Sequence, residues 1–168
     1  YNEALAIQEK ILGPDHPDVA ATLNNQATIM AEYGDYSASA DKHRRALAIR
    51  EKALGADHEW VGESTYNLAN QMAYLGNFDE ALALGERSLV IFEKQLGKKH
   101  PRYLWALLNL GQTYLDMGDF ARAATELERS LIGLEGIYGE GKSELCYPMD
   151  ALAQCHFSLG EVEKAHEL

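Results

Sequence analysis

The fold is decided by residues 97–118, GKKHPRYLWALLNLGQTYLDMG. The glycines at its two ends, Gly97 and Gly118, each recur every 42 residues along the chain. Gly97 belongs to one set with Gly13, Gly55 and Gly139, and Gly118 to another with Gly34, Gly76 and Gly160. Two more columns share this period, one apolar (Tyr36, Phe78, Phe120, Val162) and one of histidines (His16, His58, His100). Self-similarity at a fixed period of this size indicates a repeat architecture.

Each repeat is predicted to form two helices. Leu107, Leu110 and Tyr114 follow a helical spacing, and the equivalent first helix of the first repeat spans about residues 17–33. It ends at a glycine, which can adopt the left-handed conformation of a helix C-terminus. An Asp or Asn then stands where it can cap the second helix, at Asp35, Asn77 and Asp119. No alternating strand pattern occurs, so the chain is predicted to be all-α.

The hairpins are predicted to stack into one solenoid, because a two-helix hairpin cannot bury its apolar stripe alone. Small residues recur at positions where helices would approach closely: Ala27, Ala69, Gly111 and Ala153 in the first helices, and Ser39, Ala81, Ala123 and Ala165 in the second. We therefore expect an α-solenoid of stacked antiparallel helix hairpins.

Two stretches, residues 46–55 (ALAIREKALG) and residues 12–25 with their LGPDHPDVA and TLNN segments, resemble the 42-residue tetratricopeptide repeats (TPR) of kinesin light chains and related bacterial proteins. The resemblance covers essentially the whole chain. It implies a right-handed superhelix (a TPR superhelix) in which the first helices line a concave groove that holds an extended or helical peptide.

The repeat boundaries follow from the period. Residues 1–13 form a partial repeat with the second helix only, followed by repeats at 14–55, 56–97 and 98–139 and an incomplete fourth repeat at 140–168. All belong to one solenoid. Because solenoids need a polar capping helix at each end and neither end of this chain carries one, we expect a fragment of a longer protein.

The groove register that the resemblance implies predicts eleven peptide-binding residues: Asn24, Asn25, Thr28, Tyr66, Asn67, Asn70, Tyr74, Trp105, Leu108, Asn109 and Gln112. The fourth repeat adds Tyr147, Asp150, Gln154 and Phe157 to the lining. An amide both donates and accepts, so the column Asn25, Asn67, Asn109 could bond a peptide backbone without reading its side chains. Alternatively, these amides bond backbone between neighbouring helices and merely hold the stack.

Charge limits the partners. The chain has 15 Lys and Arg against 26 Asp and Glu, a net charge of −11, which argues against a nucleic-acid partner. The groove register holds no Lys or Arg, and Glu32, Glu63, Asp116 and Asp150 favour a neutral or basic ligand. No apolar run approaches the roughly 20 residues that cross a bilayer, so no membrane partner is expected.

The two cysteines favour a reducing, cytoplasmic compartment. Cys146 and Cys155 lie on one predicted helix, two and a half turns from each other, which places them on opposite faces and roughly 14 Å apart along the axis. This separation is too large for a disulfide.

Several patterns look catalytic. Residues 136–143, GIYGEGKS, match the phosphate-loop pattern, but that motif requires a preceding strand and here follows a predicted helix, so we expect no nucleotide. His16, His58 and His100 occupy successive linkers, too far apart for one zinc ion, and are predicted to cap or pack helices. His156 is predicted to be a core residue. We expect no cofactor, no metal and no catalytic residue.

The leading interpretation is a protein–protein interaction module, not an enzyme, that captures a peptide segment of a partner. Two alternatives stay open: a regulatory or recruiting arm of a larger signalling enzyme such as a protein kinase or signalling ATPase, and a purely structural scaffold.

Overall fold

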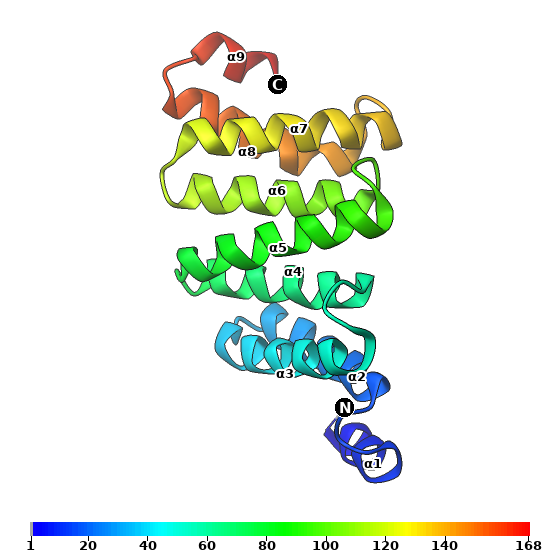
Figure 1. The fold of residues 1–168 in the computed structure, drawn as a ribbon. Helices are drawn as coiled ribbons and strands as arrows, with labels where there is room; N and C mark the ends of the chain where they lie inside the picture. Colours follow the sequence, from blue (N-terminus) through cyan, green and yellow to red (C-terminus); the bar gives the residue numbers. More distant parts are fainter. Residues whose placement is uncertain (1) are drawn as a thin grey trace. The chain divides into compact units, whose positions relative to one another are not determined.

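The computed structural model describes residues 2–168, and Tyr1, the first residue of the predicted partial repeat, lies outside them. The described residues form helices and no strand (Figure 1): α1 (Asn2–Leu12), α2 (Pro17–Glu32), α3 (Tyr36–Leu54), α4 (Glu59–Tyr74), α5 (Phe78–Leu96), α6 (Pro101–Asp116), α7 (Phe120–Tyr138), the 3₁₀ turn η1 (Ser143–Leu145), α8 (Cys146–Ser158) and α9 (Val162–Glu167). The first residues of α2, α4 and α6 are spaced by one repeat period, and so are those of α3, α5, α7 and α9. The predicted all-α repeat fold is confirmed.

The helices group into two compact units, Tyr1–Ile91 and Phe92–Leu168. In the first unit, α2 packs against α1 and α3, and α3 packs against α4. In the second, α6 packs against α7, α7 against α8, and α8 against α9. Consecutive helices within each unit run antiparallel (Figure 1), as predicted for stacked hairpins. The right-handed sense of the superhelix stays a prediction.

The periodic histidines begin the first helices. The ring nitrogen Nδ1 of His16, His58 and His100 accepts the backbone N–H two positions further on, at 3.2, 3.1 and 3.2 Å. These bonds satisfy one of the N–H groups that have no partner inside the helix. The predicted capping role of the three histidines is therefore confirmed.

The periodic acidic residues cap the second helices in the same way. Asp35 Oδ1 accepts the N–H of Ala38, and Asp119 Oδ1 accepts the N–H of Arg122, both at 3.2 Å. Just before Asp35, Gly34 has φ +80°, and the N–H of Asp35 then reaches back to the carbonyl of Met30 at 2.9 Å. This glycine-dependent closure of the helix end explains why its column repeats without exception.

The cores differ in composition between the units. The first unit buries Val19, Leu23, Leu47, Leu68 and Met72 together with polar residues such as His43 and Arg50. The second is mostly leucine, including Leu104, Leu107, Leu110, Leu127, Leu131 and Leu134. Gly111 supports the predicted close approach, because a Cβ there would lie 2.7 Å from Leu127 Cγ. The repeats thus share a backbone plan but fill it with different side chains.

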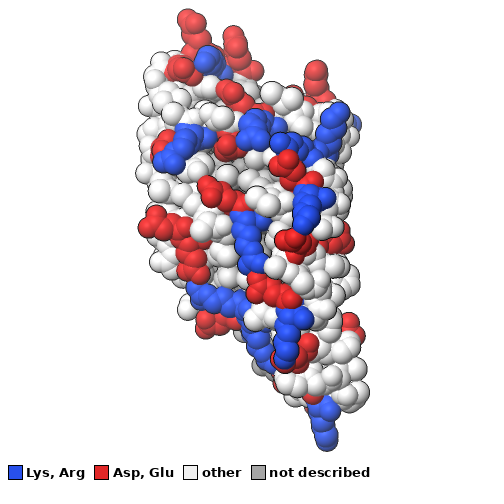
Figure 2. Space-filling model, in the orientation of Figure 1, with Lys and Arg blue, Asp and Glu red and all other residues white. Residues whose placement is uncertain are grey.

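The second helices carry a ladder of ion pairs. Arg45 binds Glu9 and Arg87 binds Glu51, each at 2.5 Å, and the two pairs are one repeat apart. Arg44 binds Glu80 at 3.1 Å. On the face drawn in Figure 2, basic and acidic side chains are accordingly interleaved. Exposed pairs contribute about 0–1 kcal/mol each, so their main consequence is that most cations of these helices are neutralised locally.

Candidate peptide-binding surface

Most of the predicted site residues reach the surface of the first helices. In the first unit these are Asn25 and Thr28 on α2, both exposed, and Tyr66, Asn67, Asn70 and Tyr74 on α4, of which Tyr74 is exposed and the others half-buried. We call these six residues the α2/α4 surface. In the second unit Trp105, Asn109 and Gln112 on α6 are half-buried, and with Tyr147 and Gln154 of α8 they form the α6/α8 surface.

Two predicted residues must be removed from the surface. Asn24 is only 5% exposed and Leu108 only 1%. They occupy the same position two repeats apart, and this position points into the hairpin. Asn24 Oδ1 accepts the N–H of His43 Nδ1 on the second helix at 2.8 Å. The side chain of Asn24 therefore joins α2 to the side chain of His43 on α3 and is not part of an exposed surface.

The neighbouring amides are different. Among the residues that the structure describes, the side-chain amides of Asn25 and Asn67 make no hydrogen bond. Asn25 follows the buried Asn24 and Asn67 follows the half-buried Tyr66, and one position turns a side chain by about 100° around the helix. No hydrogen bond of these two side chains therefore joins neighbouring helices. The hydroxyl of Thr28 donates to the carbonyl of Asn24 at 3.1 Å.

Side chains of the α6/α8 surface already make hydrogen bonds to protein partners. Gln112 Nε2 donates to Asp116 Oδ1 at 2.8 Å, and Gln112 Oε1 accepts the hydroxyl proton of Tyr147 at 3.2 Å. Gln154 Nε2 likewise donates to Asp150 Oδ2 at 2.8 Å. A ligand on this surface would have to exchange some of these exposed bonds for its own.

The surface carries little positive charge. Within their bounds, α2, α4, α6 and α8 contain a single Lys or Arg, Arg102, and six carboxylates: Asp18, Glu32, Glu59, Glu63, Asp116 and Asp150. One of these carboxylates is partly compensated from behind, because Glu63 Oε1 lies 3.4 Å from Arg50 Nη1 of α3. Within their bounds, these four helices therefore carry more acidic than basic side chains.

The buried Arg50 was not anticipated from the sequence. It is 5% exposed, and its Nη1 donates to the carbonyl of Trp60 and to Ser64 Oγ, each at 2.9 Å. The burial of Arg50 could have been predicted from the repeat, because the equivalent positions in the next two repeats are apolar, Phe92 and Leu134. A charged residue in an otherwise apolar column indicates a buried charge that needs partners.

The structure shows the local surroundings of the patterns that look catalytic. The phosphate-loop pattern begins inside α7, which ends at Tyr138, so a helix precedes the loop rather than a strand. His156 is 5% exposed, as predicted, and its Nδ1 lies 2.7 Å from Glu161 Oε2. Over the described residues, no three His, Cys, Asp or Glu side chains are placed to hold a metal ion together.

Two further predictions concern the cysteines and the membrane. Both cysteines are free thiols; Cys146 is exposed, and burial raises the pKa of Cys155. No helix of the described chain is long and apolar enough to cross a membrane.

Comparison with known proteins gives a consistent result. A family model described as tetratricopeptide repeat matches residues 1–52 and 61–133. The comparison with curated proteins finds no match.

Among solved structures, BtubC (BKLC) from P. vanneervenii has a TM-score of 0.82 at 22% identity, covering 90% of this chain and 61% of that one. The chain thus spans less than two thirds of that relative. Nearly identical TPR-like repeats of a kinesin-light-chain-like protein from Podosopora anserina give a TM-score of 0.81 at 24% identity, covering 99% and 78%. A TPR-like protein from Chlorobium tepidum gives 0.64 at 20% identity, covering 86% and 94%.

Proposed function

Because the chain belongs to the tetratricopeptide repeat family, whose repeats are protein-interaction modules, we propose that it captures a peptide segment of a protein partner on the exposed face of its first helices. The observation that carries this proposal is the pair of unbonded amides, Asn25 and Asn67, one repeat apart on α2 and α4. An amide that makes no hydrogen bond and recurs one repeat later would be explained by a ligand with a backbone to bond.

The aromatic residues of the α2/α4 surface support the same function. Tyr66 is half-buried, and Tyr74 is 67% exposed although one face of its ring stacks on the ring of Tyr36. Tyrosine is enriched among the residues that dominate binding energy at protein interfaces. The amides would fix the peptide backbone and the rings would contact its side chains.

Replacing both Asn25 and Asn67 by alanine is expected to weaken peptide binding without changing thermal stability. A peptide is first selected from a random library against the chain, labelled with fluorescein and titrated by fluorescence polarisation. Loss of two hydrogen bonds of about 1 kcal/mol each raises Kd about thirty-fold.

Gln95→Ala serves as the matched control, since it removes an exposed amide from the second helix α5. It should leave Kd unchanged. A lower melting temperature of the double variant with an unchanged Kd would instead assign the two amides to the scaffold and contradict the proposal.

The charge of the first helices leads to a second expectation. A peptide extended by a strongly acidic tail should bind no better than a scrambled peptide of the same composition, because the surface offers carboxylates and only Arg102 as a cation. The same core peptide with a basic tail should bind more tightly at low salt and lose that advantage as ionic strength rises. Tight, salt-sensitive binding of the acidic version would show that the charge argument is wrong.

A further inference from the structure

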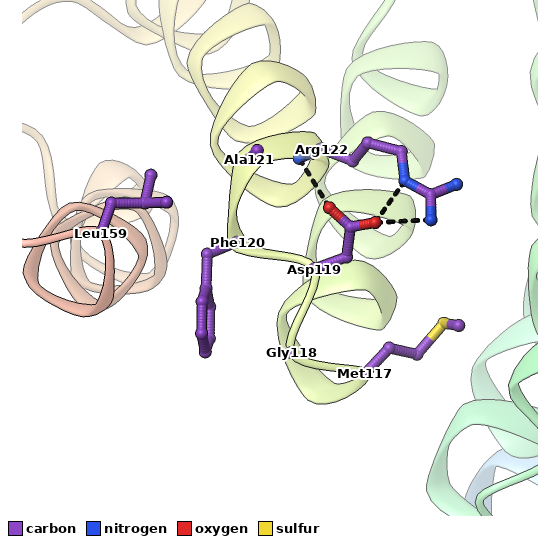
Figure 3. A pocket seen from close by; sticks show the side chains of 7 residues that line it. All are labelled: Met117, Gly118, Asp119, Phe120, Ala121, Arg122 and Leu159. Carbon is purple, nitrogen blue, oxygen red and sulfur yellow. Dashed lines mark hydrogen bonds and ion pairs between the residues drawn. The ribbon is translucent and has the colours of Figure 1, made fainter.

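A hollow of about 500 Å³ lies in the second unit, beside the turn that joins α6 to α7 (Figure 3). Its apolar wall is formed by Met117, Phe120 and, from the end of α8, Leu159. Met117 is 39% exposed and Leu159 42%, and Figure 3 shows the ring of Phe120 directed into the open space between them. This hollow is at the turn end of the hairpins and shares no residue with the α6/α8 surface.

The first unit has an equivalent turn, between α2 and α3, and there an aromatic ring covers the equivalent of Phe120. Tyr36 is the counterpart of Phe120, and Tyr74 the counterpart of Ser158, each two repeats earlier. The rings of Tyr36 and Tyr74 are stacked, with centroids 4.7 Å apart and planes 10° from parallel. One repeat's first helix thus supplies an aromatic ring that covers the aromatic residue of the preceding turn.

In the second unit that covering ring is missing. Ser158 has only a hydroxyl, which donates to the carbonyl of Gln154 in its own helix at 2.8 Å. Nothing from position 158 can therefore reach over Phe120. With serine at position 158, the hollow of about 500 Å³ beside Phe120 has no aromatic ring over it like that of Tyr74 in the first unit.

The polar rim of the hollow does not select an anion. Arg122 Nε donates to Asp119 Oδ2 at 2.5 Å, and its guanidinium carbon lies 4.6 Å from the centre of the Tyr114 ring. Figure 3 shows the pairing of Arg122 with Asp119 at the edge of the hollow. Because Asp119 pairs with Arg122 and neutralises its charge, the groups of the hollow that remain for a ligand are apolar and aromatic side chains.

We propose that this hollow binds an aromatic side chain of a protein partner, which stacks on Phe120 in the place that Tyr74 takes on Tyr36. The occupant is identified by the chain itself: the equivalent site of the first unit holds a tyrosine ring. This site is separate from the first-helix face, and its existence does not depend on peptide capture there.

The test uses the full chain with ¹³C-labelled methionine and leucine methyl groups, titrated with N-acetyl-L-tyrosinamide and followed by NMR. Saturable shifts of the Met117 and Leu159 methyls are expected, with a dissociation constant on the order of 10 mM for so small a probe. N-acetyl-L-aspartamide should give no shifts. Absence of a saturable response to the tyrosine probe would overturn the proposal.

Two variants locate the site. Ser158→Tyr supplies the missing ring, so it should abolish the shifts of Met117 and Leu159; shifts that persist in this variant contradict the proposed stacking place. Tyr74→Ser opens the equivalent place in the first unit, so a second set of saturable shifts should appear at the Leu75 methyls. If it does not, the two places are not equivalent, and the argument that assigns an aromatic ring to the hollow is overturned. Tyr74 also belongs to the α2/α4 surface, so Tyr74→Ser is read only by the tyrosinamide titration. Ser158→Tyr changes no residue of the α2/α4 surface, so its outcome and the outcome of the Asn25 and Asn67 variants are independent of one another.

Discussion

Leu104→Ala should lower the free energy of unfolding by about 2–5 kcal/mol, because it removes a fully buried side chain from the second unit. Leu104 is 3% exposed. It lies beside Gly133 of α7, and both border a hollow of about 290 Å³ that the shortened side chain would enlarge. The cost grows with the cavity that remains, so the upper half of this range is expected.

A second substitution should restore much of the loss. The first two repeats combine a small residue on the first helix with isoleucine on the second, as Ala20 with Ile49 and Gly62 with Ile91. The third repeat has the reverse, Leu104 with Gly133, and a Cβ on Gly133 would lie 2.3 Å from Leu104 Cδ2. In each of these repeats, one large side chain fills the space between the two helices, and either helix can supply it.

Gly133→Ile alone should therefore destabilise the chain by about 1–3 kcal/mol through overpacking. The double variant Leu104→Ala, Gly133→Ile should be more stable than the sum of the two single changes predicts, by up to about 3 kcal/mol. Urea unfolding of the four proteins measures this coupling. Strictly additive effects would show that the two residues do not share one space. Ile132→Ala, at an exposed position next to Gly133, is the control and should cost little.

Acid should destabilise the chain through His43 between about pH 6.5 and pH 4. Burial, and then the positive charge of Arg50, lower the pKa of His43 from 6.5 to about 4. Above pH 6.5 the imidazole is neutral in the folded and the unfolded chain, so it has no effect on stability. Below pH 6.5, His43 binds a proton in the unfolded chain but stays neutral in the folded chain until the pH nears 4. Stability therefore falls as pH falls, by about 3 kcal/mol at pH 4.

The third repeat supplies the control variant for His43. Its equivalents of Asn24 and His43 are Leu108 and Leu127, which are 1% and 0% exposed. Asn24→Leu combined with His43→Leu should fold, since the same pair of leucines already packs at that place in the chain. It also removes Asn24 Nδ2, a buried donor with no partner.

Urea unfolding at a series of pH values between 7.5 and 4 should show a much smaller loss of stability in this variant than in the native chain. An NMR titration of the native His43 gives a direct check. A pKa near 6.5 would contradict the buried neutral imidazole and the predicted acid sensitivity.

The sequence alone determined the helices of this protein and their order. The repeat period, the glycines and the capping residues act through bonds within a few positions of one another, such as His100 Nδ1 with the N–H of Arg102. Interactions of such short range depend only on neighbouring residues. For this reason the helix starts at Pro17, Tyr36 and Phe120 could be predicted to within a residue.

Tertiary structure decided which members of a column are buried. Asn24, Tyr66, Leu108 and Asp150 share one register, yet Asn24 and Leu108 are buried, Tyr66 is half-buried and Asp150 is exposed. Exposure at that register depends on the side chain that the second helix presents, and for Asn24 this is His43 of α3.

The same holds at the turn, where Tyr36 is covered by the ring of Tyr74 from the next repeat and Phe120 has no such cover. A repeat period tells which positions are equivalent, but contacts between helices decide what each position does, because each depends on the sizes and polarities of two side chains that the period does not constrain.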